Sequence, residues 1–239
     1  MYDIQTLLKK VSEKKDLLDF LKNYMTDERS ERFQEVLKNR TRHFTVVVED
    51  LHKERNASAI VRTCDCFGIQ DVYVIENNNE YLLSEGISKG ADKWVNVNIY
   101  DNFPDNTGQC LSDLRSMGYQ IIATSPNKSE NNLENFDISK KTAFIFGGEK
   151  DGLSERAMEE ADGFISIPMY GFTESFNISV AGALLLYNVM SKLHKSKLNW
   201  HLEPSEMIVL QLEWTIKTIA SSEQLISKYM EKRSGTVKK

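Results

Sequence analysis

Apolar and polar positions alternate along this chain with two different periods. Short apolar runs recur between residues 44 and 169, and the densest are FTVVVEDL (44–51), AFIFGG (143–148) and GFISIP (163–168). Near-continuous apolar runs are typical of strands that are buried on both faces. Helical patterns separate the runs, and this alternation predicts an α/β fold built on a parallel sheet that is covered on both sides.

The pattern assigns the elements of this region. Strands are expected at 44–51, 71–76, 93–100, 119–125, 142–148 and 163–169. Helices are expected at 56–68, 111–118, 153–161 and 177–194. One hydrophobic core of this kind fits the length of 239 residues better than two complete domains.

Helical patterns without strand signals flank the sheet region. Residues 4–25 carry apolar side chains at spacings of three, four and seven, as an amphipathic helix does. Asp27 is the expected cap of a second helix, and Pro204 suits the first position of a helix near the C-terminus. We expect the leading 24 residues to pack onto the body rather than to have a separate function. The expected organisation is an N-terminal helical extension, an α/β domain and a C-terminal helical extension, at 1–43, 44–195 and 196–239.

Composition narrows the class of protein. The 30 basic and 35 acidic residues, with 27% charged and 41% hydrophobic residues, are typical of a globular protein rather than a disordered one. No apolar run approaches the roughly 20 residues that span a bilayer, and no apolar signal core is present at the N-terminus, so we expect a cytoplasmic protein without membrane partners. The three cysteines indicate buried thiols, and no metal-site spacing is present.

Three segments at expected strand ends carry candidate chemistry. The first, FGGEKDGLSE (146–155), places Gly147, Gly148 and Gly152 around Glu149. Glycines there permit positive φ angles or the close approach of a ligand, although a plain tight turn explains them equally well. The pattern is neither a P-loop nor a dinucleotide fingerprint.

The second segment, IPMYGFTESFNIS (167–179), precedes the expected helix at 177–194. Ser175 or Asn177 could serve only as the cap of that helix. The helix begins with small residues, among them Gly182, and then becomes apolar on several faces. A helix of this kind is buried on both sides, so we expect it at a subunit interface.

The third segment, NASAIVRTCDCFG (56–68), contains a lone arginine, Arg62. On a helical wheel Arg62 falls with Ser58 and Asp65, opposite the apolar face. The wheel therefore predicts a solvent-facing arginine that pairs with Asp65, three residues later, and Asn56 is the expected helix cap.

Together the three segments resemble the signature motifs of the SpoU/TrmH family of RNA ribose 2′-O-methyltransferases, within the SPOUT superfamily. The first motif resembles N-x-x-A-I-x-R-T-x-x-x-F-G, the second G-x-E-x-x-G-L-S and the third I-P-M-x-G-x-x-x-S-L-N-V-S-V-A. They are met by Asn56, Ala59, Ile60, Arg62, Thr63, Phe67, Gly68, Gly147, Glu149, Gly152, Leu153, Ser154, Ile167, Pro168, Met169, Gly171, Ser175, Asn177, Ser179, Val180 and Ala181. This chain departs from the third motif with Phe176 and Ile178, which remain apolar.

The resemblance implies a SPOUT fold with a C-terminal trefoil knot that binds S-adenosyl-L-methionine. It assigns cofactor binding to Thr124, Gly147, Gly148, Ile167, Met169 and Phe176. It assigns the catalytic site to Arg62, Asn56, Glu149, Ser175 and Asn177, completed in a homodimer. A guanidinium is too weak a base to take the ribose proton readily, so we expect Arg62 to stabilise the developing alkoxide instead.

The segment MTDERSERFQEVLKNRTRHF (25–44) is similar to the N-terminus of family members that methylate guanosine 18 in the tRNA D-loop. The resemblance implies tRNA, and no DNA, as the partner. The basic residues expected to contact RNA are Arg29, Arg32, Arg40 and Arg42. The alternatives are ribosomal RNA, another tRNA position, or a non-catalytic RNA-binding protein. A net charge of −5 sits poorly with RNA binding, which depends on phosphate contacts.

Overall fold

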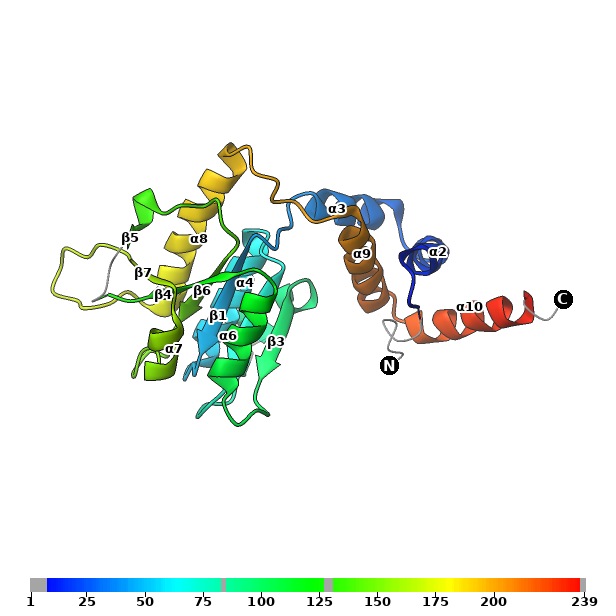
Figure 1. The fold of residues 1–239 in the computed structure, drawn as a ribbon. Helices are drawn as coiled ribbons and strands as arrows, with labels where there is room; N and C mark the ends of the chain where they lie inside the picture. The colour runs from blue at the N-terminus through cyan, green and yellow to red at the C-terminus, as the bar shows by residue number, and fades with distance from the viewer. Residues whose placement is uncertain (1–7, 83–84, 127–130, 237–239) are drawn as a thin grey trace. The chain divides into compact units, whose positions relative to one another are not determined.

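The computed structural model describes residues 8–82, 85–126 and 131–236 (Figure 1). The chain divides into two compact units. One unit joins the two ends of the chain, Met1–Arg40 and His201–Lys239, and the other is Thr41–Trp200. The N-terminal and C-terminal extensions, which the sequence pattern predicted as two separate parts, therefore belong to one unit.

The unit Thr41–Trp200 is built on a single parallel sheet. Within the described residues its strands follow the order β3-β2-β1-β6-β4-β7-β5, and every neighbouring pair is parallel. Their bounds are β1 Phe44–Glu49, β2 Asp71–Ile75, β3 Asn96–Tyr100, β4 Gln120–Thr124, β5 Asn131–Asn132, β6 Thr142–Phe146 and β7 Gly163–Ser166. The predicted parallel α/β fold is confirmed, and the two-residue β5 is an addition that the pattern did not predict.

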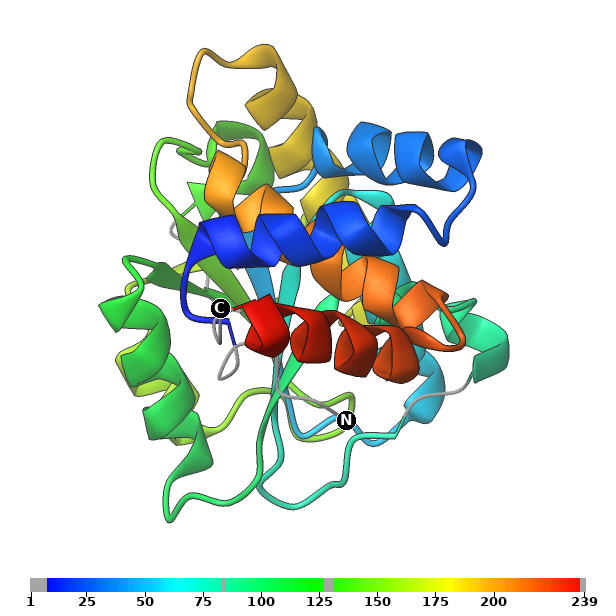
Figure 2. The same ribbon diagram turned by 90° about the vertical axis from the view of Figure 1, so that its right-hand side faces the viewer.

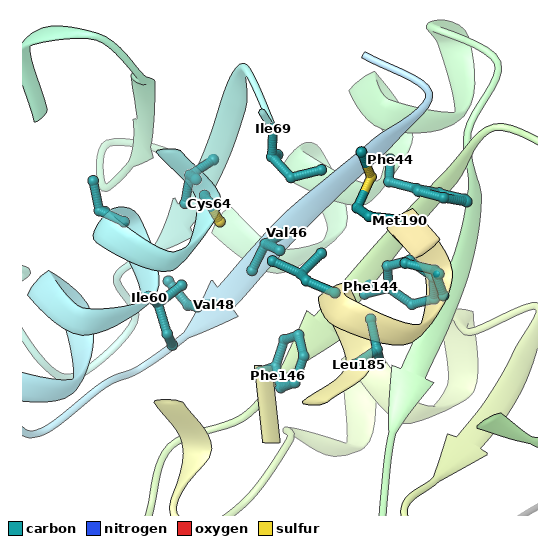
Figure 3. Packing of buried hydrophobic residues seen from close by; sticks show 14 of the residues in the cluster. Phe44, Val46, Val48, Ile60, Cys64, Ile69, Phe144, Phe146, Leu185 and Met190 are labelled. Atoms are coloured by element: carbon teal, nitrogen blue, oxygen red, sulfur yellow. The ribbon is translucent and has the colours of Figure 1, made fainter. Parts of the chain in front are cut away.

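Alternation along the strands divides the core between the two faces of the sheet. On one face Val46, Val48 and Phe144 pack against α4 (Glu54–Cys66) and α8 (Ile178–Lys195), as Figure 3 shows. On the other face Val47 and Ile145 pack against α6 (Asn106–Ser116) and α7 (Glu155–Glu160). The sheet is therefore the middle of three layers, and its carboxyl ends lead into the loops that the sequence marks as functional.

Several boundaries differ from the expectations. Helix α6 begins at Asn106 rather than at residue 111, because the Asp105 side chain accepts a hydrogen bond from the Gly108 N–H at 2.8 Å and caps the helix. The strand expected at 93–100 begins only at Asn96, and Lys93 instead ends a short 3-10 helix, Ala91–Lys93. The short helix α5 (Glu85–Ser88) and the 3-10 turn Leu133–Asn135 were also not predicted.

The second unit contains α2 (Val11–Lys22), α3 (Asp27–Leu37), α9 (Pro204–Thr218) and α10 (Ser222–Thr236). Leu17, Leu21 and Ile226 belong to its core, and in Figure 2 the blue α2 lies beside the red α10. The predicted helix at 4–25 is shorter, and its first residues, 4–7, lie outside the described part. The cap of α3 is Thr26, which accepts from the Arg29 N–H, so the assignment of Asp27 as the cap is wrong.

Pro204 is the first residue of α9, as predicted, because a first-turn N–H needs no partner within the helix. In the described part of the chain no helix is long and apolar enough to cross a membrane.

Candidate functional site

The three sequence segments follow the carboxyl ends of β1, β6 and β7, and only β4 separates these strands in the sheet. The turn after β6 carries Glu149, and β6 lies between β1 and β4. The segment after β1 leads into α4, which carries Asn56, and the segment after β7 leads into α8, which is preceded by Asn177. Ligands of parallel α/β sheets bind beyond the carboxyl ends of the strands.

A chain of hydrogen bonds joins the three segments. The Asn177 Nδ2 donates to the Asn56 Oδ1 at 3.1 Å, and the Asn56 Nδ2 donates to the Glu149 Oε1. The Asn177 Oδ1 in turn accepts from the Ser179 N–H at 2.9 Å and from its hydroxyl at 2.6 Å. The relay runs from Ser179 to Asn177, then to Asn56 and finally to Glu149. It joins residues as far apart in the chain as Asn56 and Ser179, which are 123 positions apart.

The relay has one direction because its last member can only accept. An ionised carboxylate has no proton to donate, so both Asn56 and Asn177 turn their amide NH₂ groups toward Glu149. The second carboxylate oxygen of Glu149 accepts from the His52 N–H at 3.1 Å. Partial burial raises the pKa of Glu149, but the bonds from Asn56 and the backbone, with Lys53 nearby, outweigh it and lower the pKa below its ordinary value. Glu149 therefore stays ionised at neutral pH.

Asn56 lies inside α4, whose cap position is Lys53, so the expectation that Asn56 caps this helix is wrong. Asn177 does cap α8, since its side chain accepts from the Ser179 N–H. One residue therefore starts the helix and holds Asn56 as well. The two alternatives for Asn177, cap or site residue, do not exclude each other.

The protein backbone itself requires two of the three glycines in the segment 146–155, Gly147 and Gly148. A Cβ on Gly147 would lie 2.1 Å from the Gly152 carbonyl carbon and 2.2 Å from the Leu153 nitrogen. A Cβ on Gly148 would lie 2.5 Å from the Asp50 carbonyl oxygen. Of the three glycines in this turn, Gly152 alone has a positive φ, 72°. Close packing of the turn is thus sufficient to explain Gly147 and Gly148, without any ligand at either position.

The other residues assigned to cofactor binding lie at or beyond adjacent strand ends. Thr124 is the last residue of β4, and its hydroxyl donates to the Ile145 carbonyl at 3.0 Å. Ile167 and Met169, beyond β7, are half-buried, and Ile167 packs against the core. Phe176 is 42% exposed just before α8. Apolar side chains and backbone of three neighbouring strand ends thus converge here, which fits the adenosine part of a nucleoside cofactor.

Arg62 is exposed, as the wheel predicts, but its expected pairing with Asp65 is wrong. Among the residues that the structure describes, the Arg62 side chain has no ion pair or hydrogen bond, and it shares none with the relay. Ser58, placed beside Arg62 by the wheel, is fully buried, because α4 is covered by α8 as well as by the sheet. Ser175 is exposed and likewise outside the relay.

Two of the four arginines expected to contact RNA have other partners. The Arg40 side chain is 1% exposed and lies over the Trp214 ring, 5.3 Å from its centroid. The Arg42 Nε donates to the Asp71 Oδ2 at 2.6 Å. In this conformation Arg40 is covered by protein, and Arg42 is neutralised by a buried carboxylate. The burial of Arg40 argues against an RNA contact in this conformation, and an RNA contact of Arg42 stays a prediction.

The other two arginines, Arg29 and Arg32, are exposed on α3. Arg32 forms an exposed ion pair with Glu35 at 2.6 Å. Such a pair is worth little in water and can be exchanged for a phosphate contact. In the described residues no three His, Cys, Asp or Glu side chains are grouped as a metal site would need.

Sequence reasoning missed three residues that build the site. His52 contributes a backbone N–H, which no sequence pattern reveals. Ser179 was matched in the motif but not placed in the site. Glu49 is 1% exposed and bonded to the Glu149 turn, and its signal was present, because it is an acidic residue at the end of an otherwise apolar strand.

Comparison with known proteins decides the family. The model of the SpoU rRNA Methylase family matches residues 43–187. The chain belongs to the SpoU methylase family. The tRNA (guanosine(18)-2′-O)-methyltransferase of Borreliella burgdorferi is 40% identical over 210 residues, which are 87% of this chain and 94% of that protein.

Solved SpoU methylases share the fold. The A. aeolicus TrmH/SpoU tRNA modifying enzyme has a TM-score of 0.73 and 32% identity, and the match covers 81% of this chain and 98% of that one. The SpoU methyltransferase AviRb from Streptomyces viridochromogenes, solved in complex with the cofactor AdoMet, has a TM-score of 0.57 and 20% identity, covering 68% of this chain and 65% of that one. At that identity the second likeness supports the fold alone.

The likeness to the A. aeolicus enzyme extends beyond the sheet unit. Thr41–Trp200 comprises 160 of the 239 residues, or 67%, whereas the match covers 81%. Part of the helical unit is therefore matched as well.

Proposed function

We propose that this SpoU methylase transfers a methyl group from S-adenosyl-L-methionine to the ribose 2′ oxygen of guanosine 18 in the D-loop of tRNA. The observation that carries the proposal is the relay, which joins Asn56, Glu149 and Asn177 of all three family motifs at one edge of the sheet. The name of the Borreliella burgdorferi relative, similar over most of both chains, supports this nucleotide.

The cofactor supplies an electrophilic methyl group on a sulfonium. The chain supplies the surface that holds it, through Thr124, Ile167, Met169, Phe176 and the backbone at Gly147 and Gly148. The predicted trefoil knot of this region stays a prediction. We also propose a cytoplasmic location, where the proposed tRNA substrate is found.

The ribose oxygen must lose its proton as its bond to carbon forms and the carbon–sulfur bond breaks. Arg62 stabilises the negative charge that develops on this oxygen, because a guanidinium keeps its proton at neutral pH and donates in a planar fork. The proton leaves to a substrate phosphate or to water. Asn56, Glu149 and Asn177 hold the start of α4, the turn after β6 and the start of α8 in fixed positions, and the reactants are oriented between them. Ser175 contacts the substrate.

We propose that the active form is a homodimer, in which a second copy covers one face of α8. Val180, Leu184 and Tyr187 are 45%, 40% and 65% exposed and recur at helical spacing on this face. Leu185 and Leu186 face the core instead, and Gly182 packs near the Phe146 ring rather than toward a partner. A large apolar stripe on an exposed helix is typical of a subunit interface.

Replacement of Leu184 with Glu should convert the dimer to a monomer, because a charge at the centre of the stripe would be buried without a partner. Sedimentation velocity at micromolar concentration measures the change. Ile99→Glu is the control, because Ile99 is similarly exposed, at 46%, on the distant edge strand β3. A Leu184→Glu protein that sediments as the unmodified one does would refute this interface.

Removal of Arg29 should weaken tRNA binding and reduce the slope of log affinity against log salt by about 1, the value of one lost phosphate contact. Removal of Arg40 should leave that slope unchanged and lower the melting temperature, because its guanidinium is buried over Trp214. Filter binding at several salt concentrations and thermal melts separate the two effects. Equal salt slopes for the unmodified protein and Arg29→Ala would remove Arg29 from the RNA surface.

The substrate class is tested with purified protein and labelled S-adenosylmethionine. We expect label to enter unmodified tRNA transcripts and not ribosomal RNA fragments. Transfer to ribosomal RNA alone would favour the first alternative. Absence of both transfer and cofactor binding, measured by calorimetry, would favour a non-catalytic RNA-binding protein.

A further inference from the structure

Glu49 is a buried carboxylate whose partners are all hydrogen-bond donors. It ends β1 and is 1% exposed. Its Oε1 accepts from the Thr107 hydroxyl at 2.6 Å and from the Ser154 hydroxyl at 2.8 Å, and its Oε2 accepts from the Ser154 N–H at 2.8 Å. In the described part of the chain no cation pairs with it. Three donors compensate a charge that would otherwise be costly to bury.

Ser154 closes the turn that carries Glu149. It is the cap of α7, since its side chain accepts from the Ala157 N–H at 3.1 Å. It therefore donates to Glu49 through both its N–H and its hydroxyl, and still starts the helix. One buried carboxylate consequently fixes the place where the turn ends.

The opening end of the same turn packs against Asp50, the residue that follows β1. Gly148 lies so close to the Asp50 carbonyl oxygen that a Cβ would come within 2.5 Å of it. The turn closes on itself through the Gly152 N–H, which donates to the Gly148 carbonyl at 3.0 Å. Both ends of the Glu149 turn are thus held by one dipeptide, Glu49-Asp50: Glu49 bonds to Ser154, and Asp50 packs against Gly148.

The segment that follows this dipeptide carries the partners of Glu149. The His52 N–H and the Asn56 side chain both donate to the Glu149 carboxylate. Asp50 has a positive φ of 52°, and its carboxylate accepts from the N–H groups of residues 77, 78 and 79, which fixes the departure of the chain from β1. The dipeptide therefore sets the position of donor and acceptor in the relay.

We infer that Glu49 is a positioning residue of the methyl-transfer reaction, which acts through Ser154 to hold Glu149 against Asn56. The inference rests on the proposed function for its kinetic readout. Glu49 itself touches neither substrate nor cofactor. Donors bond to both oxygens of its side chain, whereas a glutamine carries an NH₂ group in place of one oxygen and cannot accept at both ends.

In the full-length protein Glu49→Gln should lower kcat about 10- to 100-fold, the effect of a misplacement of catalytic groups on the order of 1 Å. The KM for tRNA should stay within about threefold, because the exposed RNA-binding surface is unchanged. Thr107→Val is the matched control. It removes one bond to Glu49, at 2.6 Å, and leaves both bonds to Ser154 in place, so we expect kcat within about threefold of the unmodified protein.

A double-mutant cycle with Ser154→Ala tests whether Glu49 acts through Ser154. We expect Glu49→Gln to lower kcat by a smaller factor in the Ser154→Ala background than in the unmodified protein, because that background has already lost the hydroxyl bond to Glu49 and keeps only the N–H bond. Full additivity of the two losses would contradict this route. A Glu49→Gln protein that melts at a lower temperature with kcat within about threefold of the unmodified protein would overturn the inference and leave Glu49 with stability alone.

Hydrogen exchange gives a readout that does not depend on activity. Glu49→Gln should increase amide exchange in residues 147–160 more than Thr107→Val does, because only the former removes one of the two oxygens that accept from the Ser154 N–H and hydroxyl. Equal exchange in the two variants would also overturn the inference. If the unmodified protein transfers no methyl group to tRNA, the proposed function fails, whereas this exchange result still decides the positioning role of Glu49.

Discussion

Replacement of Arg62 with Ala should lower kcat for methyl transfer by about 100- to 1,000-fold, the usual effect of removing a group that stabilises developing oxyanion charge. The dissociation constant for S-adenosylmethionine should change less than about threefold, because Arg62 is not among the residues at the strand ends assigned to the cofactor. The large effect on kcat is expected because the Arg62 guanidinium is exposed and, among the described residues, unpaired, so it is available to the substrate. Single-turnover transfer and calorimetry measure the two quantities separately.

Arg55→Ala is the matched control for charge alone. Arg55 is exposed on the same helix and lies seven residues, close to two helical turns, before Arg62. We expect it to change the KM for tRNA a few-fold at most and to leave kcat unchanged. Arg62→Lys should recover only part of kcat, because an ammonium keeps the charge but loses the planar fork. A kcat of Arg62→Ala within about threefold of the unmodified protein would contradict the assigned role.

Replacement of Gly147 with Ala should destabilise the protein by about 3 kcal/mol or more and lower its melting temperature by roughly 6–12 °C, since the new Cβ meets backbone that cannot move away. The contacts are the Gly152 carbonyl carbon at 2.1 Å and the Leu153 nitrogen at 2.2 Å. Thermal melts without cofactor measure the effect, because the explanation invokes no ligand.

Two other glycines provide a graded control. Gly171→Ala should change stability by less than about 0.5 kcal/mol, because nothing lies within 4 Å of its Cβ position. Gly152→Ala should cost about 1 kcal/mol, from its φ of 72° alone. A Gly147→Ala protein with an unchanged melting temperature but lost cofactor binding would show that the glycine serves ligand approach, as the sequence alone suggested.

The sequence predicted the fold well where periodicity and burial agree. Strand β6 is apolar because it is buried on both faces, and that pattern needs no knowledge of its neighbours, whereas β7 alternates between buried and half-buried positions. The wheel failed at Ser58, because α4 is contacted by α8 on a side that a single-helix projection treats as solvent. Two helix starts were predicted too late, because the capping side chains lie earlier: Thr26 is one residue before Asp27, and Asp105 is six residues before residue 111.

The candidate site could be located from its three motifs but not assembled from them. Periodicity assigned Asn56 to a cap and gave no reason for it to meet Asn177, 121 residues later, although their side chains are hydrogen-bonded at 3.1 Å. The same limit applies to Arg40, whose basic side chain looks suited to RNA in the sequence. Only packing against Trp214, in a helix that is far away along the chain, shows that it is buried.

The most direct test of the central claim compares two tRNA transcripts that differ by one oxygen atom. The purified protein is given S-adenosylmethionine and either the ordinary transcript or one with 2′-deoxyguanosine at position 18, and the products are mapped by mass spectrometry of nuclease fragments. We predict one methyl group on the ribose of guanosine 18 in the first transcript and none in the second. Equal methylation of both transcripts, or a methyl group on another nucleotide, would contradict the account.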